Sequence, residues 1–256
     1  MSTQGVEFES LNVTVAGNRQ LLHDITLRIE PNTTTALLGR SGSGKTTLLR
    51  TVNALVRPTT GHVLVGDQDV STADPITLRR SIGYVIQETG LFPHFTVERN
   101  VGIVLEAEGR SREERARRSD DLLRAVGLDA TSFGRRYPHQ LSGGQRQRVG
   151  LARALAADPS ALLMDEPFGA LDPLTRGEMQ DMLRELLGRL KKTVLLVTHD
   201  LNEALYLGDQ IALLNEGKLI ACLPRDKFLS SDLTEVRAYV ASVQRGERSA
   251  EEAARR

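Results

Sequence analysis

The residue pattern with the clearest chemical meaning is a glycine-rich segment of the form G-x-x-x-x-G-K-T, from Gly39 to Thr46. Residues 33–38 before it are β-branched and apolar, which predicts a short buried strand. After it, apolar residues recur at helical spacing, at Leu48, Leu49, Val52, Leu55 and Val56. A glycine-rich turn between a strand and a helix predicts a phosphate-binding loop, because glycines let consecutive backbone N–H groups point at an anion.

Each part of this loop has a predicted role. The free N–H groups and the positive dipole end of the helix would hold phosphate. Lys45 would reach the β- and γ-phosphates, and the Thr46 hydroxyl would bind Mg²⁺. The alternative is an ordinary Gly/Ser loop with a helix-capping residue. The residues expected to contact a nucleotide here are Gly39, Arg40, Ser41, Gly42, Ser43, Gly44, Lys45, Thr46 and Thr47.

Two carboxylates follow the apolar residues 161–164, a predicted strand. Acidic groups at the carboxyl end of a parallel strand lie where such folds bind ligands. We therefore expect Asp165 to hold Mg²⁺, directly or through water, and Glu166 to polarise an attacking water. A strand that simply ends in a polar turn is the alternative, since Pro167 and Gly169 follow.

Two other predicted strands also end in polar residues. His199 follows the predicted strand 193–197, and Gln87 follows the predicted strand 82–86. At the same edge of the sheet, His199 would lie near the γ-phosphate, and Gln87 could bind Mg²⁺ or water. A structural histidine and a polar turn are the alternatives. The next residue, Asp200, could cap the following helix together with Glu203.

A second glycine-rich helix start follows Leu141: Ser142, Gly143, Gly144 and Gln145. The S-x-x-Q spacing predicts a capping box. Two glycines in a first turn weaken a helix by up to about 1 kcal/mol each. They suit a helix start that a phosphate must approach closely.

Bulk composition narrows the class of protein. The 256 residues include 33 basic and 33 acidic side chains, so the net charge is zero and no basic excess suggests a nucleic-acid partner. The arginines at 112, 115, 117 and 118 alternate with acids, which favours a solvated helix face. The single cysteine, Cys222, excludes internal disulfides. The first ten residues carry no signal-peptide pattern, and no apolar run approaches membrane-spanning length.

The order of predicted elements indicates the architecture. Two antiparallel strands precede the loop, over 6–14 and 25–29. Strands alternate with helices later, which argues for a mostly parallel α/β sheet. Residues 88–158 are mostly helical and would form an insertion. The charged residues 245–256 suggest a frayed or loose helix.

Taken together, these motifs resemble the ATP-binding cassette family, specifically the nucleotide-binding subunits of ABC transporters. In family order they are Walker A (39–46), the Q-loop (Gln87), the signature (141–145), Walker B with its following acid (162–166), the D-loop (170–172) and the switch (His199). The resemblance implies a P-loop NTPase with a RecA-like core, an antiparallel β subdomain and an inserted α-helical subdomain. It divides the chain into a cassette domain over 1–240, with the helical subdomain at about 88–158, and a charged tail over 241–256.

The resemblance also implies ATP and Mg²⁺ as ligands and a set of partners. Such cassettes dimerise head to tail, so Ser142, Gly143, Gly144 and Gln145 of one copy would contact ATP held by Lys45 of the other. The dimer would sit on the cytoplasmic face of the membrane, bound to transmembrane permease subunits, in a complex with a solute-binding protein. The apolar segment 91–93 is expected to receive a short helix of the permease.

The sequences of two segments narrow the resemblance to one group of importers within the family. Residues 82–94 and 136–141 look like those of importers of osmoprotectants such as glycine betaine, choline or carnitine. Importers of another solute, such as a sulfonate or an amino acid, and soluble non-transport ABC ATPases are the alternatives. One feature departs from the family, which usually places an aromatic ring for adenine near position 16. Phe8 and His23 are the nearest rings, and neither fits well, so we expect weak base discrimination.

Overall fold

The computed structural model describes residues 4–87 and 89–254. Glu88, where the helical insertion is expected to begin, lies outside the described residues. Arg255 and Arg256, the end of the expected tail, also lie outside them.

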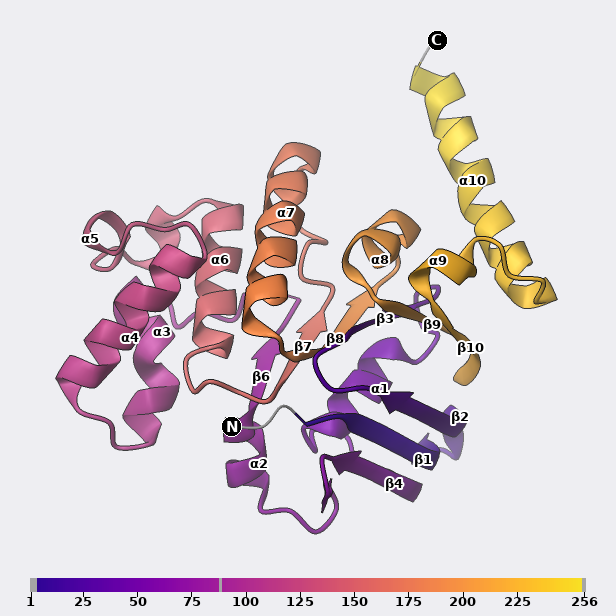
Figure 1. Ribbon diagram of the computed structural model, residues 1–256, viewed down its shortest axis with the longest axis horizontal. Helices are drawn as coiled ribbons and strands as arrows, with labels where there is room; N and C mark the ends of the chain where they lie inside the picture. The colour runs from indigo at the N-terminus through magenta and orange to yellow at the C-terminus, as the bar shows by residue number, and fades with distance from the viewer. Residues whose placement is uncertain (1–3, 88, 255–256) are drawn as a thin grey trace.

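A six-stranded sheet forms the centre of the molecule (Figure 1). Its order is β10-β9-β3-β8-β7-β6, and all neighbours are parallel except β10, which runs antiparallel to β9. Every residue of β3, β7 and β8 is buried, as expected for parallel strands covered on both faces. The predicted mostly parallel sheet is confirmed. Its strands are β3 (Thr34–Leu38), β6 (Ile82–Val85), β7 (Ala161–Asp165), β8 (Thr193–Thr198), β9 (Gln210–Asn215) and β10 (Lys218–Pro224).

A smaller antiparallel sheet lies beside the first, in the order β2-β1-β4-β5. The predicted antiparallel pair before the loop is its centre, and alternating residues of β1 are buried against α1 and the main sheet. The strands are β1 (Val6–Val15), β2 (Arg19–Ile29), β4 (Thr60–Val65) and β5 (Gln68–Asp69).

Helix α1 (Lys45–Val52) lies between the two sheets. Leu48, Leu49 and Val52 are fully buried there, which explains their helical spacing. The expected continuation of this helix to Val56 is wrong. Ala54 adopts the left-handed conformation with φ 54°, which ends the helix. Leu55 is consequently 52 % exposed.

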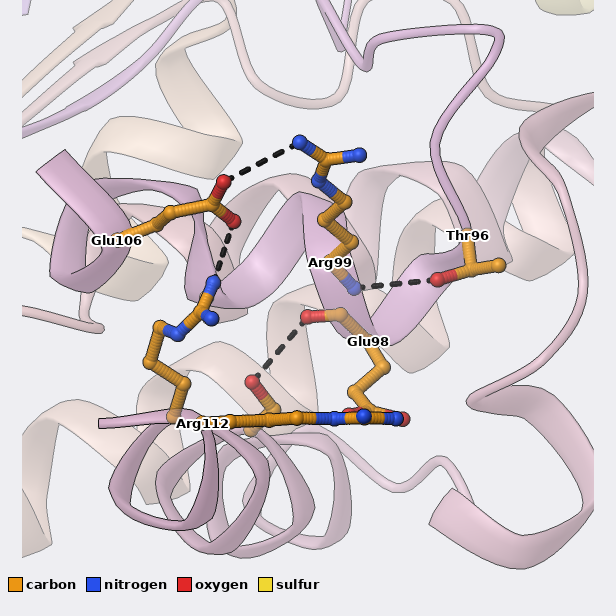
Figure 2. A pocket seen from close by; sticks show the side chains of 8 residues that line it. Thr96, Glu98, Arg99, Glu106 and Arg112 are labelled. Carbon is orange, nitrogen blue, oxygen red and sulfur yellow. Dashed lines mark hydrogen bonds and ion pairs between the residues drawn. The ribbon is translucent and has the colours of Figure 1, made fainter. Parts of the chain in front are cut away.

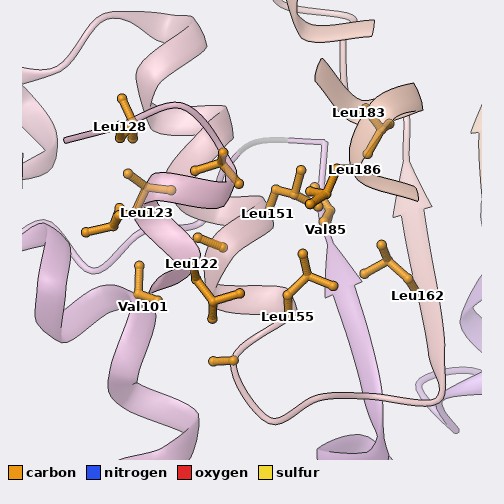
Figure 3. Packing of buried hydrophobic residues seen from close by; sticks show 14 of the residues in the cluster. Val85, Val101, Leu122, Leu123, Leu128, Leu151, Leu155, Leu162, Leu183 and Leu186 are labelled. Carbon is orange, nitrogen blue, oxygen red and sulfur yellow. The ribbon is translucent and has the colours of Figure 1, made fainter. Parts of the chain in front are cut away.

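The predicted insertion is a group of helices beside β6 (Figure 1). Thr96 and Ser111 cap the first two of them, because the side-chain oxygen of each accepts a backbone N–H of the first helical turn. Leucines from this group pack on Val85 of β6 and Leu162 of β7, which attaches the group to the main sheet (Figure 3). The elements are α3 (Val97–Ala107), α4 (Arg112–Ala125), α5 (Ala130–Phe133), the short 3₁₀ helix η1 (Pro138–Gln140) and α6 (Gly143–Ala154).

The remaining helices connect or cover strands: α2 (Pro75–Ser81), α7 (Pro173–Leu190), α8 (Leu201–Leu207), α9 (Arg225–Phe228) and α10 (Thr234–Ala254). Helix α10 packs its first half against the edge of the main sheet and then projects away from the body (Figure 1). It runs through position 240, where the cassette domain is expected to end. Within the described residues, no helix is both long and apolar enough to cross a membrane.

Candidate functional site

The phosphate-loop motif forms the turn between β3 and α1, as its sequence predicts. Gly39 has a φ of 153°, and a Cβ added there would lie 2.3 Å from the carbonyl oxygen of Leu214. Gly44 has a φ of 100°, and its Cβ would lie 2.8 Å from the Leu22 side chain. Both positions therefore require glycine, because conformation and space exclude any side chain. The loop is held between β9 and β2.

Lys45 opens α1 and points into the loop. Its side chain is buried, and Nζ donates hydrogen bonds to the carbonyl oxygens of Gly39 at 2.8 Å and Arg40 at 2.9 Å. Burial lowers the pKa of Lys45, while the nearby Glu166 and Asp165 act to raise it. Beside it, the hydroxyl of Ser43 is buried without a hydrogen-bond partner. The loop thus presents an ammonium group and an unsatisfied hydroxyl, both suited to phosphate oxygens.

Asp165 is the last residue of β7, and its side chain is only 3 % exposed. Its Oδ1 accepts a 2.7 Å hydrogen bond from the Thr46 hydroxyl. Its Oδ2 lies 3.4 Å from both the Arg50 guanidinium and the Tyr84 hydroxyl. The first turn of α1 and the end of β7 therefore meet at one carboxylate.

Glu166 and His199 form a second pair at the same edge of the sheet. His199 Nδ1 lies 3.3 Å from Glu166 Oε2. Glu166 has a φ of 46°, an unusual conformation for a residue with a side chain, and its N–H donates to Val197 on the adjacent strand β8. Such strain costs on the order of 1–3 kcal/mol and concentrates at functional sites. The turn directs the Glu166 carboxylate toward the loop.

A cavity of about 400 Å³ joins the loop to two of the predicted strand-end residues. Ser41 to Thr47 line it together with Gln87 and Glu166, so the structure brings the predicted strand-end residues to the loop. Arg19 and Leu21 of β2 line the rest of it. A neighbouring cavity of about 460 Å³ joins Arg40, Ser41, Glu166 and His199 to α10.

The second glycine-rich segment, residues 142–145, forms the start of α6. Ser142 caps α6, and the predicted capping box is present, with the Gln145 N–H donating to Ser142 Oγ at 3.2 Å. None of the residues 142–145 lines the phosphate-loop cavity of the same chain. Gly144 also has a packing role, because its Cβ would lie 2.5 Å from Thr175 Cγ2 on α7.

Sequence reasoning missed Arg50, Tyr84, Arg19 and Leu21. No local motif marks Arg50 or Tyr84. Tyr84 meets Asp165 only when β6 pairs with β7, and Arg50 meets it only when α1 packs beside β7. Of the two rings considered for a base, Phe8 is fully buried in the core and is excluded. His23 is not among the residues that line the loop cavity.

A separate cavity of about 330 Å³ lies between α3 and α4 (Figure 2). Glu106 accepts hydrogen bonds there from Arg99, at 3.2 Å, and from Arg115. Arg118 donates to the carbonyl oxygens of Leu155 and Ala156, at 3.2 Å each. Two of the α4 arginines thus bind partners within the insertion.

The chain resembles known proteins in sequence and in fold. A profile of the ABC transporter family matches residues 22–169. The osmoprotectant import ATP-binding protein OsmV of Salmonella typhimurium is 45 % identical over 83 % of this chain and 56 % of its own length. The sulfate/thiosulfate import ATP-binding protein CysA of Nocardia farcinica is 48 % identical over 86 % of this chain and 68 % of its own length.

A solved dimeric ATP-binding cassette, bound to ADP and Pi in a post-hydrolysis state, superposes with a TM-score of 0.77. It is 33 % identical and is covered over 98 % of its length, against 86 % of this chain. The chain spans little more than half the length of several osmoprotectant relatives. By family profile, sequence identity and fold, this chain belongs to the ABC transporter family and has the P-loop NTPase fold of its ATP-binding cassettes.

Proposed function

We propose that this chain binds and hydrolyses ATP as the nucleotide-binding subunit of a membrane importer. The observation that carries this proposal is the meeting of three groups at one sheet edge. They are the buried Lys45 in its loop, the Thr46–Asp165 hydrogen bond and the Glu166–His199 pair. A cation, a metal-binding oxygen pair and a base beside one cavity are the parts that phosphoryl transfer requires.

The residues of the loop would bind the phosphates. Lys45 would exchange its bonds to the Gly39 and Arg40 carbonyl oxygens for phosphate oxygens, and the unpartnered Ser43 hydroxyl would gain a partner. Thr46, Gln87 and Asp165 supply the hydroxyl, amide and carboxylate oxygens that would hold Mg²⁺. When bound, Mg²⁺ would neutralise charge on the phosphates.

Glu166 is the proposed general base. Its carboxylate lines the loop cavity, where it would accept a proton from the attacking water. The His199 ring, 3.3 Å from that carboxylate, would orient it and face the terminal phosphate. Gln87 would position the water or the metal at the end of β6.

A second copy would complete each site. Ser142, Gly143, Gly144 and Gln145 lie away from the loop of their own chain, so in a head-to-tail dimer they would reach the loop of the other. The arrangement is isologous and gives two composite sites. The dimeric solved relative supports this proposal.

The names of the relatives support an importer of glycine betaine, choline or carnitine. The chain would then bind permease subunits at the cytoplasmic face as a peripheral protein, in a complex with a solute-binding protein and without nucleic acid. Its cassette domain would cover residues 1–240. A different solute is the second candidate, because the sulfate/thiosulfate relative is 48 % identical.

The test uses Glu166→Gln in the purified chain. ATP binding should persist, turnover should fall by about 10²- to 10⁴-fold, and ATP should trap a stable dimer measurable by light scattering. Unchanged turnover would rule out Glu166 as the base. Uptake of labelled glycine betaine and of sulfate by the complex in vesicles then separates the two cargo classes.

A further inference from the structure

One end of the phosphate-loop cavity is formed by a strand outside the loop. Arg19 and Leu21 open β2, and both line this cavity. Their side chains point to the same side, because alternate residues of a strand share a face. The strand lies directly against the loop, since a Cβ on Gly44 would be 3.2 Å from the Leu21 carbonyl oxygen.

The chemistry of the opposite end fixes the direction of a bound nucleotide. In the proposed function Glu166 and Gln87 would act on the terminal phosphate, so this phosphate would face the ends of β7 and β6. The loop follows β3, which has β8, β7 and β6 on one side of it in the main sheet. On the other side, β2 packs against the loop and against the turn at Gly217 after β9. The nucleoside must therefore extend toward the remaining lining residues, which are Arg19 and Leu21.

The structure leaves few groups at that end to contact a base. Phe8 is fully buried, and His23 contacts the turn at Gly217 instead, 2.7 Å from where a Cβ would be. Val15 pairs directly with Arg19 across the β1–β2 hairpin and is 42 % exposed. Arg19 is exposed, and its guanidinium has no hydrogen bond or ion pair with any described residue.

We propose that Arg19 is the base-contacting residue of this site, with its planar guanidinium stacked on the base and Leu21 beside the sugar. Guanidinium planes stack on aromatic rings and on bases. Such stacking carries no hydrogen-bond code, because every base has a π-face. Arg19 thus performs the task of an aromatic ring and makes the site tolerant of both purines.

This inference rests on the proposed ATP site, so its test separates the base from the phosphates. Binding of ATP, GTP and inorganic tripolyphosphate with Mg²⁺ is measured by calorimetry. Arg19→Ala should weaken ATP and GTP alike by roughly 5- to 150-fold. Tripolyphosphate, which has no base, should bind the variant as it binds the unaltered chain.

Three further variants make the test specific. Arg19→Lys keeps the charge but loses the plane, so it should behave like Arg19→Ala, whereas Arg19→Trp should retain nucleotide affinity. Arg28→Ala is the matched control, because Arg28 is an exposed arginine of the same strand, paired with Glu30 and outside the cavity. Arg28→Ala should leave the affinities for ATP, GTP and tripolyphosphate unchanged.

The contrary outcomes are distinct. In one of them Arg19→Ala loses affinity for ATP and for tripolyphosphate equally, and in another Arg19→Lys keeps full affinity for ATP. Either result would show that Arg19 provides charge rather than a stacking plane. Unchanged ATP affinity in Arg19→Ala would overturn the inference and leave the proposed function intact. Failure of the unaltered chain to bind ATP would overturn both.

Discussion

The hydroxyl of Thr46 donates a 2.7 Å hydrogen bond to Oδ1 of Asp165, a residue 119 positions later in the chain. The bond joins the start of α1 to the end of β7. It places a hydroxyl and a carboxylate where a metal ion shared with phosphate would bind. Arg50 and Tyr84 hold the other carboxylate oxygen, so the orientation of Asp165 is set from both sides.

The Tyr84 hydroxyl should therefore affect metal affinity. In Tyr84→Phe, Oδ2 of Asp165 loses one donor, and we expect the Mg²⁺ concentration for half-maximal ATPase activity to rise about tenfold. The loss in unfolding free energy should stay within about 1 kcal/mol. Tyr206→Phe, which removes a hydroxyl bonded to Asp181 at the surface, is the control. Equal Mg²⁺ dependence in both variants would contradict this role.

Lys45 should be required for nucleotide binding. Lys45→Ala or Lys45→Met should abolish measurable ATP binding or hydrolysis, because Lys45 is the buried cation of the loop, whereas Arg19, which also lines the cavity, comes from β2. Normal affinity and rate in these variants would overturn the phosphate assignment.

Lys45 should also destabilise the nucleotide-free chain in a way that depends on pH. Burial lowers the pKa of Lys45 from its ordinary value of 10.5, so between the lowered pKa and 10.5 the unfolded chain binds more protons than the folded chain. Stability from this group therefore rises with pH in that window. Below the window, Lys45→Met should be more stable than the unaltered chain, and the difference should shrink toward pH 10.5. Urea unfolding at several alkaline pH values measures it, and a constant difference would contradict it.

The packing role of Gly144 and its proposed contact with nucleotide can be separated by mutation. Gly144→Ala should destabilise the fold, because its Cβ would meet the Thr175 methyl group at 2.5 Å. Thr175→Ser removes that methyl group, so the double variant should recover its unfolding temperature. If Gly144 also contacts nucleotide held by a second copy, turnover in the double variant should remain reduced. Full recovery of turnover would leave only the packing role.

The segment after Gln87 is expected to bind the permease, and the structure refines which residue to change. Leu91 packs partly against the core of the insertion, whereas Phe92 is 42 % exposed. Phe92→Asp should spare folding and basal ATPase activity but weaken assembly with the permease. Ile76→Asp, at an exposed position of α2, is the control. Intact co-purification and transport with Phe92→Asp would count against this docking site.

Tyr239 of α10 links the C-terminal helix to His199. Its hydroxyl lies 3.4 Å from the His199 carbonyl oxygen. We expect Tyr239→Phe to lower kcat roughly threefold while KM for ATP stays constant, because loss of this hydrogen bond affects the position of His199 rather than phosphate binding. Tyr137→Phe, at an exposed ring of the insertion, is the control. A change in KM alone would argue against this link.

The sequence by itself determined the features that depend on neighbours along the chain. The loop from Gly39 to Thr46 and the capping box from Ser142 to Gln145 follow from glycine conformations and hydrogen bonds within three or four residues. The alternation of strands and helices fixed the fold class for a similar reason, since hydrophobic periodicity is local.

Only the tertiary structure decided which distant residues meet. The order of strands in the main sheet brings Tyr84 and Asp165 together, because β6 pairs with β7 across an insertion. The packing of β2 against the loop places Arg19 at the cavity, and the end of α1 at Val52 depends on the left-handed Ala54. These contacts arise from burial of apolar surface between elements far apart in the chain, which no local pattern records.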